Sequence, residues 1–92
     1  MILNFKDAEA EKVYATGKSR QFGSIARVAS RRLGAISFAK GIEDLREPPG
    51  NRFEALKGDR KGQYSIRIND QYRVCFRWDG QDALDVEIVD DH

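Results

Sequence analysis

The spacing of apolar residues changes once along this chain, and that change constrains the fold more than any other feature of the sequence. Before the loop Pro48-Pro49-Gly50-Asn51, apolar residues recur at every third or fourth position, and after it they recur at every second position. The first spacing predicts helices, and the second predicts strands with one buried face. Helices followed by a run of hairpins indicate an α+β protein in which helices cover one face of an antiparallel sheet.

The first half of the chain is expected to form two helices. Asp7 is the expected N-cap of the first helix, and Thr16-Gly17 is its expected end. Apolar residues at helical spacing predict a second helix over about residues 24–39, with Gly41 as a candidate cap. Residues 2–5 are expected to form a short edge strand.

The second half is expected to form an antiparallel meander. Apolar and polar residues alternate in three segments, at residues 64–68, 72–78 and 84–88, after a shorter strand near residues 53–56. Asp79-Gly80 is a typical hairpin turn. We therefore expect one domain over residues 1–92, with two N-terminal helices packed on a twisted antiparallel sheet.

One face of the two central strands is expected to be basic. The residues that alternate with the apolar set, and so lie on the uncovered face, are Ser65, Arg67, Arg73 and Arg77. An ordinary solvated face mixes acids and bases, whereas the charged residues of this set are all arginines. The pattern predicts an anion-binding site on the open face of the sheet.

Composition excludes several kinds of site. The 92 residues include one Cys and one His, so no Cys/His cluster can bind a metal and no internal disulfide can form. The sequence contains no glycine-rich phosphate loop and no nucleophile elbow. Its apolar runs are too short to span a membrane, and its first residues do not resemble a signal peptide. We expect a cytoplasmic protein with neither metal nor cofactor.

A metal-free basic site is well suited to RNA. RNA carries its own nucleophile, the 2′-hydroxyl, so an enzyme needs only to move protons and to stabilise the crowded phosphate. Arginine and lysine can stabilise the phosphate, and a histidine can shuttle a proton. His92 is the single histidine, and Asp90 and Asp91 beside it favour its charged form.

The chain resembles the HigB-type toxins of the RelE/ParE superfamily, also called the plasmid maintenance system killer family. The resemblance lies mainly in a central block and in the C-terminal segment, at residues 54–67, 69–76 and 86–92. It continues into the first half, at residues 14–20 and 45–52, and so covers essentially the whole chain. The central block together with the final histidine makes the resemblance specific.

The resemblance implies a fold, an activity and partners. The fold would be the RelE-like microbial RNase fold. The activity would be that of a type II toxin, a metal-independent endoribonuclease (an mRNA interferase) that cleaves mRNA on the translating 70S ribosome and so inhibits translation and growth. A HigA-type helix-turn-helix antitoxin would neutralise it, and the chain would meet operator DNA only through that antitoxin.

The resemblance also implies roles for individual residues. Arg73 matches the phosphate-stabilising arginine of the family, Lys57 matches a basic residue near the scissile phosphate, and Asp90 and His92 match the C-terminal acid–base pair. Further candidates for contact with the substrate or the ribosome, or else simply solvated side chains, are Arg60, Arg67 and Arg77.

Two positions depart from some members of the family. Glu54 stands where certain relatives have a histidine, and Asp91 stands where the family commonly has a tyrosine. A tyrosine there could stack on a base, whereas an aspartate cannot and brings a negative charge near the phosphate. Both residues are counted among the candidates for substrate contact, and the aspartate is expected to reduce activity.

Two other functions remain open at this point. The chain could inhibit its target by binding alone, as the ParE branch does, in which case residues 90–92 would be dispensable. It could also be a weakened toxin that acts mainly as antitoxin partner and co-repressor, in which case Asp91→Tyr would restore toxicity.

Overall fold

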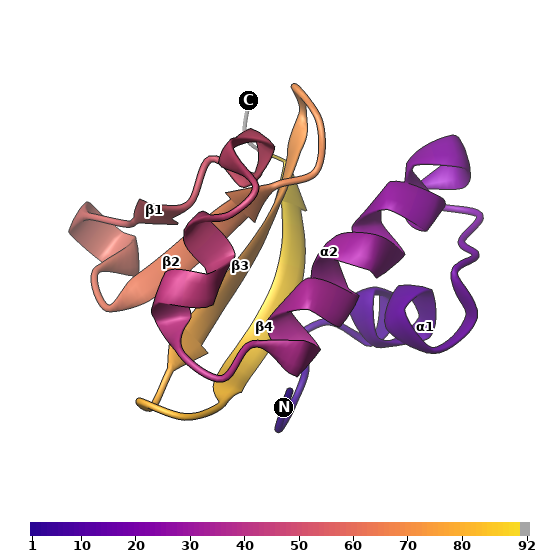
Figure 1. The fold of residues 1–92 in the computed structure, drawn as a ribbon. Helices are drawn as coiled ribbons and strands as arrows, with labels where there is room; N and C mark the ends of the chain where they lie inside the picture. The colour runs from indigo at the N-terminus through magenta and orange to yellow at the C-terminus, as the bar shows by residue number, and fades with distance from the viewer. Residues whose placement is uncertain (91–92) are drawn as a thin grey trace.

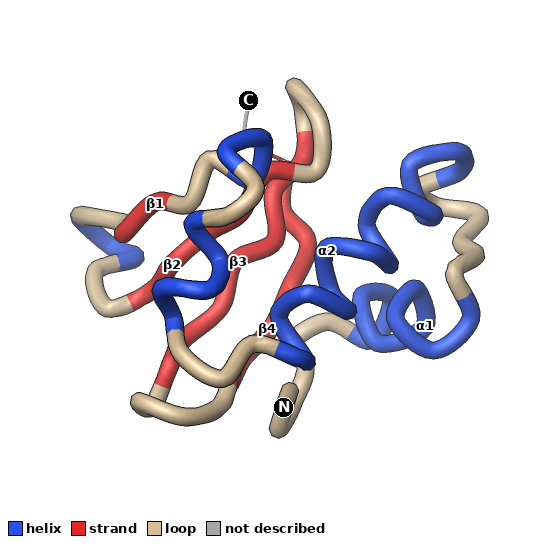
Figure 2. The backbone as a smooth tube through the Cα atoms, viewed as in Figure 1, coloured by secondary structure: helices blue, strands red, loops and turns tan. Residues whose placement is uncertain are grey.

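The computed structural model describes residues 1–90, so Asp91 and His92 lie outside the described residues. Two α-helices come first, α1 (Ala8–Thr16) and α2 (Ala26–Phe38). Four antiparallel strands follow in the spatial order β1-β2-β3-β4: β1 (Glu54–Ala55), β2 (Gln63–Arg67), β3 (Tyr72–Trp78) and β4 (Ala83–Asp90). The expected α+β architecture of two helices and an antiparallel sheet is confirmed (Figures 1 and 2).

The hydrophobic core lies between the helices and one face of the sheet, which α2 covers in Figure 1. The helices contribute small and branched side chains, among them Val13, Leu33 and Ile36. The sheet contributes the alternating apolar set, with Val74 and Phe76 fully buried. No helix in this described part of the chain is long and apolar enough to cross a membrane.

Both ends of α1 form as the sequence predicts. The side chain of Asp7 accepts a hydrogen bond from the backbone N–H of Glu9 at 2.9 Å, which satisfies a donor that the helix itself leaves unpaired. Gly17 takes a left-handed conformation, with φ of 71°, and its N–H caps the helix by donating to the carbonyl of Val13.

The second helix ends differently from our expectation. A 3-10 turn (Gly23–Ile25) leads into α2, which ends at Phe38. Its C-cap is Ala39, in an extended conformation, so the predicted cap at Gly41 is wrong. Gly41 instead precedes a 3-10 helix, Ile42–Arg46. The reason is Asp44, whose carboxylate accepts the backbone N–H groups of residues 40 and 41 and so turns the chain into this new element.

The predicted edge strand at residues 2–5 pairs with the free edge of β4. Two parallel bridges join Ile2 to Ala83 and Phe5 to Val86. Between them the side chain of Asn4 adds to the backbone hydrogen bonds. Its Oδ1 accepts the N–H of Asp85 at 3.0 Å, and its Nδ2 donates to the Asp85 carboxylate at 2.8 Å. The first residues of the chain are therefore fixed to its last described strand.

A β-bulge in β4 shifts the alternation of its side chains. Between the pairs Cys75–Glu87 and Arg77–Leu84, β4 advances three residues while β3 advances two. The extra residue is Asp85, which has a positive φ of 51°. The bulge shifts the alternation, so Leu84 is half-buried and pairs with Arg77 on the open face instead of entering the core.

Truncation of the central aromatic residue should destabilise the fold strongly. Phe76 is 0% exposed, and Phe76→Ala should lower the free energy of unfolding by about 3–5 kcal/mol because it leaves a cavity. Urea denaturation measures this change. Arg31→Ala, at an exposed position of α2, is the control and should change stability by less than about 0.5 kcal/mol. A loss below about 1 kcal/mol in Phe76→Ala would contradict the described core.

The hairpin between β3 and β4 should contribute stability that depends on pH. The pKa of Asp79 is lowered because its carboxylate accepts the backbone N–H groups of Asp82 and Gln81, at 2.7 Å and 2.9 Å. A folded-state pKa below the unfolded value stabilises the fold above the unfolded pKa, and this contribution is lost as pH falls through the folded pKa.

We therefore expect the Asp79 carboxyl carbon to titrate at lower pH in the native protein than in the urea-unfolded chain, as measured by NMR. Asp79→Asn should reduce the acid sensitivity of folding, since it removes the titrating group. A native titration at or above the unfolded one would show that the turn does not hold the carboxylate.

Candidate functional site

The open face is the face of the sheet opposite α2, and the strand register gathers three arginines on it. Arg67 lies directly opposite Arg73, Ser65 opposite Cys75, and Arg77 opposite the glutamine that begins β2. The predicted grouping of Arg67, Arg73 and Arg77 on one face is therefore present. Like charges directly opposite each other destabilise a sheet, so this grouping needs compensation.

Carboxylates from outside the two central strands compensate most of these charges. Three pairs form: Arg67 with Asp70, Arg77 Nε with Asp85 Oδ2 at 3.6 Å, and Arg60 Nη1 with Glu87 Oε2 at 3.3 Å. The acids come from β4 and from the turn after β2, so the alternation of the central strands alone does not reveal them. The open face is more balanced than its sequence pattern indicates.

Arg73 differs, because uncharged oxygens hold it. Its Nε donates to the Ser65 hydroxyl at 2.8 Å, and one terminal nitrogen donates to the backbone carbonyl of Arg52 at 2.7 Å. It forms no ion pair within the part of the chain that the structure describes. Its guanidinium is thus fixed in position while its charge is not neutralised, which is what binding of a phosphate requires.

The loop that presents the Arg52 carbonyl is itself anchored. Asn51 is 1% exposed, and its amide donates to the carbonyls of Leu45 and Glu47 at 3.3 Å and 3.1 Å. Arg52 follows with φ of 45°, a left-handed conformation that non-glycine residues rarely adopt. We infer that Ser65 and this loop position Arg73, a role that nothing in the sequence pattern marks.

Glu54 lies at the β1 edge of the open face, and Lys57 follows β1 by two residues. Glu54 pairs with Ser65, the residue that holds Arg73. Glu54 and Lys57 also line one hollow of about 340 Å³ together with the two residues between them, and both are exposed. The structure therefore brings these two predicted residues together, next to the strand that anchors Arg73.

Asp90 lies on the other face of the sheet by the alternation of β4. It pairs with Tyr72, whereas Val89 pairs with Arg73. Its carboxylate accepts a hydrogen bond from the side chain of Gln71 at 3.1 Å. The structure does not bring Asp90 next to Arg73, and the other two predicted tail residues, Asp91 and His92, lie outside the described residues.

Two other features of the molecule bear on its chemistry. Over residues 1–90 there is no group of three or more His, Cys, Asp or Glu side chains that could hold a metal ion. Cys75 is buried in β3, at 2% exposure.

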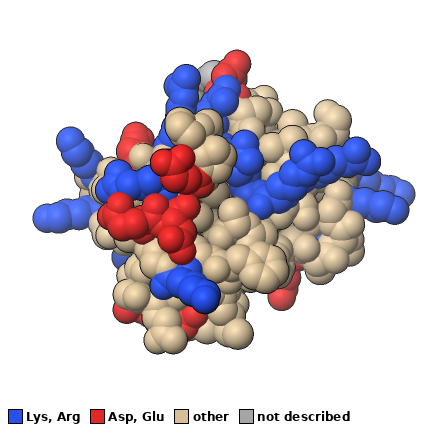
Figure 3. All heavy atoms as spheres, in the orientation of Figure 1, with Lys and Arg blue, Asp and Glu red and all other residues tan. Residues whose placement is uncertain are grey.

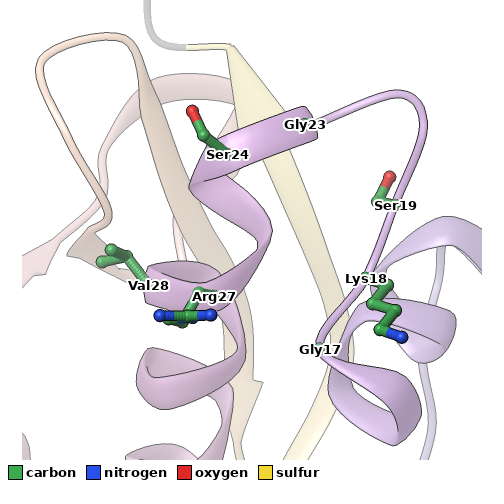
Figure 4. A pocket seen from close by; sticks show the side chains of 7 residues that line it. All are labelled: Gly17, Lys18, Ser19, Gly23, Ser24, Arg27 and Val28. Carbon is green, nitrogen blue, oxygen red and sulfur yellow. The ribbon is translucent and has the colours of Figure 1, made fainter.

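A second basic region lies on the helical side of the molecule. Residues 12–40 contain no Asp or Glu, and their cations are Lys12, Lys18, Arg20, Arg27, Arg31, Arg32 and Lys40. Figure 3 shows Lys and Arg side chains along α2. A hollow of about 580 Å³ opens here, with Lys18 on the linker after α1 and Arg27 on α2 among its lining residues (Figure 4).

Comparison with known proteins agrees with this architecture. The family described as "RelE-like toxin of type II toxin-antitoxin system HigB" matches residues 3–92, which is nearly the whole chain. The chain therefore belongs to the HigB-like toxins of the RelE-like group.

Two relatives illustrate this similarity. Toxin HigB-1 of Vibrio cholerae serotype O1 is 45% identical over 80 residues, which cover 85% of this chain and 84% of that protein. An uncharacterized protein of Haemophilus influenzae is 33% identical over 82 residues, which cover 87% of this chain and 81% of that protein.

Removal of the Ser65 hydroxyl should make the position of the Arg73 guanidinium less well defined. The group is fully buried and accepts a charge-assisted bond, so Ser65→Ala should lower the free energy of unfolding by about 1–3 kcal/mol. It should also shift and broaden the Arg73 Nε–H signal in NMR spectra. Ser24→Ala removes an exposed hydroxyl and is the control. An unchanged Arg73 signal in Ser65→Ala would show that Ser65 does not position the guanidinium.

Proposed function

We propose that this HigB-like toxin of a type II toxin–antitoxin system is a ribosome-dependent mRNA endoribonuclease that binds its substrate on the open face. The observation that supports this most directly is the state of Arg73. Its guanidinium is held by two neutral oxygens and has no carboxylate partner within residues 1–90, while Arg60, Arg67 and Arg77 each face a carboxylate. A fixed, uncompensated cation stabilises charge that develops at a reacting phosphate.

The proposed reaction uses the 2′-hydroxyl of the RNA as nucleophile. Its proton passes to a base, its oxygen forms a bond to the adjacent phosphorus, and the bond from phosphorus to the 5′-oxygen breaks as that oxygen takes a proton from an acid. The products are a 2′,3′-cyclic phosphate and a free 5′-hydroxyl, and no metal is needed. Arg73 stabilises the crowded phosphate, and Lys57 adds a second cation. The family resemblance assigns the acid–base pair to Asp90 and His92, although the side chain of Asp90 lies on the face of the sheet away from Arg73.

The remaining candidates would contact RNA around the cleaved bond. Arg67 and Arg77 lie on the same face as Arg73, and Glu54 lies beside its anchor, so these side chains can line the path of the strand or meet the ribosome. Arg60 and Asp91 complete this proposed contact set. Binding through Lys and Arg should weaken as salt rises, because counterions are released from the phosphates.

The family also implies a protein antitoxin. We propose that this antitoxin is a HigA-type helix-turn-helix protein, that the toxin meets operator DNA only through it, and that both act in the cytoplasm. We further propose that residues 1–92 form a single domain with the RelE-like microbial RNase fold. Two helices and a four-stranded antiparallel sheet are in agreement with that fold.

Replacement of Arg73 tests the proposed chemistry. Arg73→Ala should lower the rate of mRNA cleavage by about 10²–10³-fold, because a preorganised donor to the transition state is lost. Primer extension on mRNA translated in a cell-free system measures cleavage, and growth after expression without antitoxin measures toxicity. Arg73→Lys should recover little activity, since lysine lacks the planar fork of donors.

Lys40→Ala is the matched control, because it removes one positive charge from an exposed position on the helical side. It should leave cleavage close to the wild-type rate. Growth arrest that survives Arg73→Ala and deletion of residues 90–92 would instead indicate inhibition by binding alone, and would overturn the nuclease proposal.

A further inference from the structure

A small hollow at one end of the open face is lined by side chains that the proposed cleavage chemistry does not use. Its volume is about 180 Å³, and its lining residues are Lys6, Gln63, Arg77, Asp85 and Glu87. These residues come from β2, β3, β4 and the N-terminal segment. The four segments meet near the bulge in β4. We call this the edge hollow.

The side chains of the edge hollow are held in place from both sides. Glu87 has a side chain only 16% exposed, and its Oε2 lies 3.3 Å from Arg60 Nη1 and 3.5 Å from Lys6 Nζ. Arg60 Nη1 also donates to Gln63 Oε1 at 3.0 Å. On the other side, Asp85 is fixed by the amide of the N-terminal segment and faces Arg77. The geometry is that of a preformed site.

Donors and an acceptor of this hollow remain available. Within residues 1–90, Glu87 Oε1 and Gln63 Nε2 form no hydrogen bond or ion pair, since Glu87 and Gln63 use their other atoms for the bonds described above. The Lys6 ammonium has further N–H donors as well. A phosphate would fit this mixture poorly, because the two carboxylates would repel it. The edge of a nucleobase fits, because it carries donors and acceptors side by side.

The position of the hollow relative to Arg73 agrees with a base-binding role. Arg77 is four residues from Arg73 on the same face of the same strand, which is about 13 Å at the usual rise of a strand. A strand of RNA whose phosphate lies on Arg73 therefore reaches the hollow within a few nucleotides. The volume is below the roughly 300–1,000 Å³ of pockets for drug-sized ligands, and suits a single base.

We propose that the edge hollow reads one nucleobase that flanks the cleaved bond, and that Glu87 makes it prefer a base with an exocyclic amino group. The free carboxylate oxygen accepts from the amino group of cytosine, adenine or guanine, and uracil has no such group. Lys6, Gln63 and Arg77 donate to the acceptors of the same base. This inference rests on the proposed function, because it assigns a specificity to that same RNA-binding face.

The test compares wild-type protein with Glu87→Gln on translated mRNA in which the nucleotides around the cleaved bond are randomised. Sequencing of the cleaved ends gives the base preference at each position. The wild type should disfavour uracil at one flanking position by roughly 5- to 150-fold, the range that one base contact supplies. Glu87→Gln should lose most of that preference while it still cleaves, since glutamine keeps the shape and loses the charge.

Glu43→Gln is the matched control, because it removes a carboxylate that is exposed and paired with Arg46 outside the open face. It should keep the wild-type preference. An unchanged preference in Glu87→Gln, or a fall in rate that is equal for all sequences, would overturn the inference. If Glu87→Gln melts well below the wild type, Lys6→Met provides the second variant, because Lys6 is more than half exposed and lines the same hollow.

A binding measurement separates this inference from the proposed cleavage. NMR titration with 2′-deoxy trinucleotides, which cannot be cleaved by this mechanism, should shift the side-chain amide of Gln63 when the bound base carries an amino group, and less with uracil analogues. The shift should disappear in Glu87→Gln and persist in Arg73→Ala. Shifts without any mRNA cleavage would reject the nuclease proposal alone, and cleavage without shifts at Gln63 would reject the edge hollow alone.

Discussion

Repulsion between cations is the constraint on which the open face depends. The register of β2 and β3 sets Arg67 directly against Arg73, and neither strand supplies an acid between them. The two arginines are held by different kinds of partner. Asp70 binds Arg67 from the adjoining turn, while Arg73 is held by a hydroxyl and a carbonyl. Arg67 is thereby paired with a carboxylate, while Arg73 has no carboxylate partner within residues 1–90. This asymmetry singles out Arg73 as the point on the face where we propose that a phosphate binds.

The fold follows from local signals that act over short distances. The change of apolar period at residues 48–51 separates helices from strands, and Asp7 with Gly17 defines α1 closely because capping is a local interaction. The errors come from side-chain hydrogen bonds, one local and one between distant residues, that the spacing of apolar residues does not indicate. Asp44 accepts the backbone N–H of Lys40, just after α2, and so turns the chain into the next 3-10 helix. Asn4 bonds to Asp85 in the bulge, although the two residues are far apart in the sequence. Neither contact is visible in the periodicity of the segment that it changes.

The candidate site is predictable only where alternation decides it. Alternation places Arg67, Arg73 and Arg77 on one face, but it says nothing about which of them is neutralised, because their partners lie on other elements. The two groups that hold Arg73, the Ser65 hydroxyl and the Arg52 carbonyl, are the hardest part of the site to predict from the sequence. A buried serine in a strand looks like a packing residue, and the carbonyl of a loop residue leaves no trace in the sequence.

The pairing of the N-terminal segment with β4 has a consequence for synthesis. Residue 2 pairs with residue 83, and both carboxylates of the edge hollow lie on β4, which is made after the other three strands of this sheet. Contacts between such distant parts of a chain cannot form until the later part has left the ribosome. A growing chain therefore carries Arg73 before it carries the strand that completes the face around it. The face that we propose to bind substrate is therefore complete only after β4 has been made and has paired with the N-terminal segment.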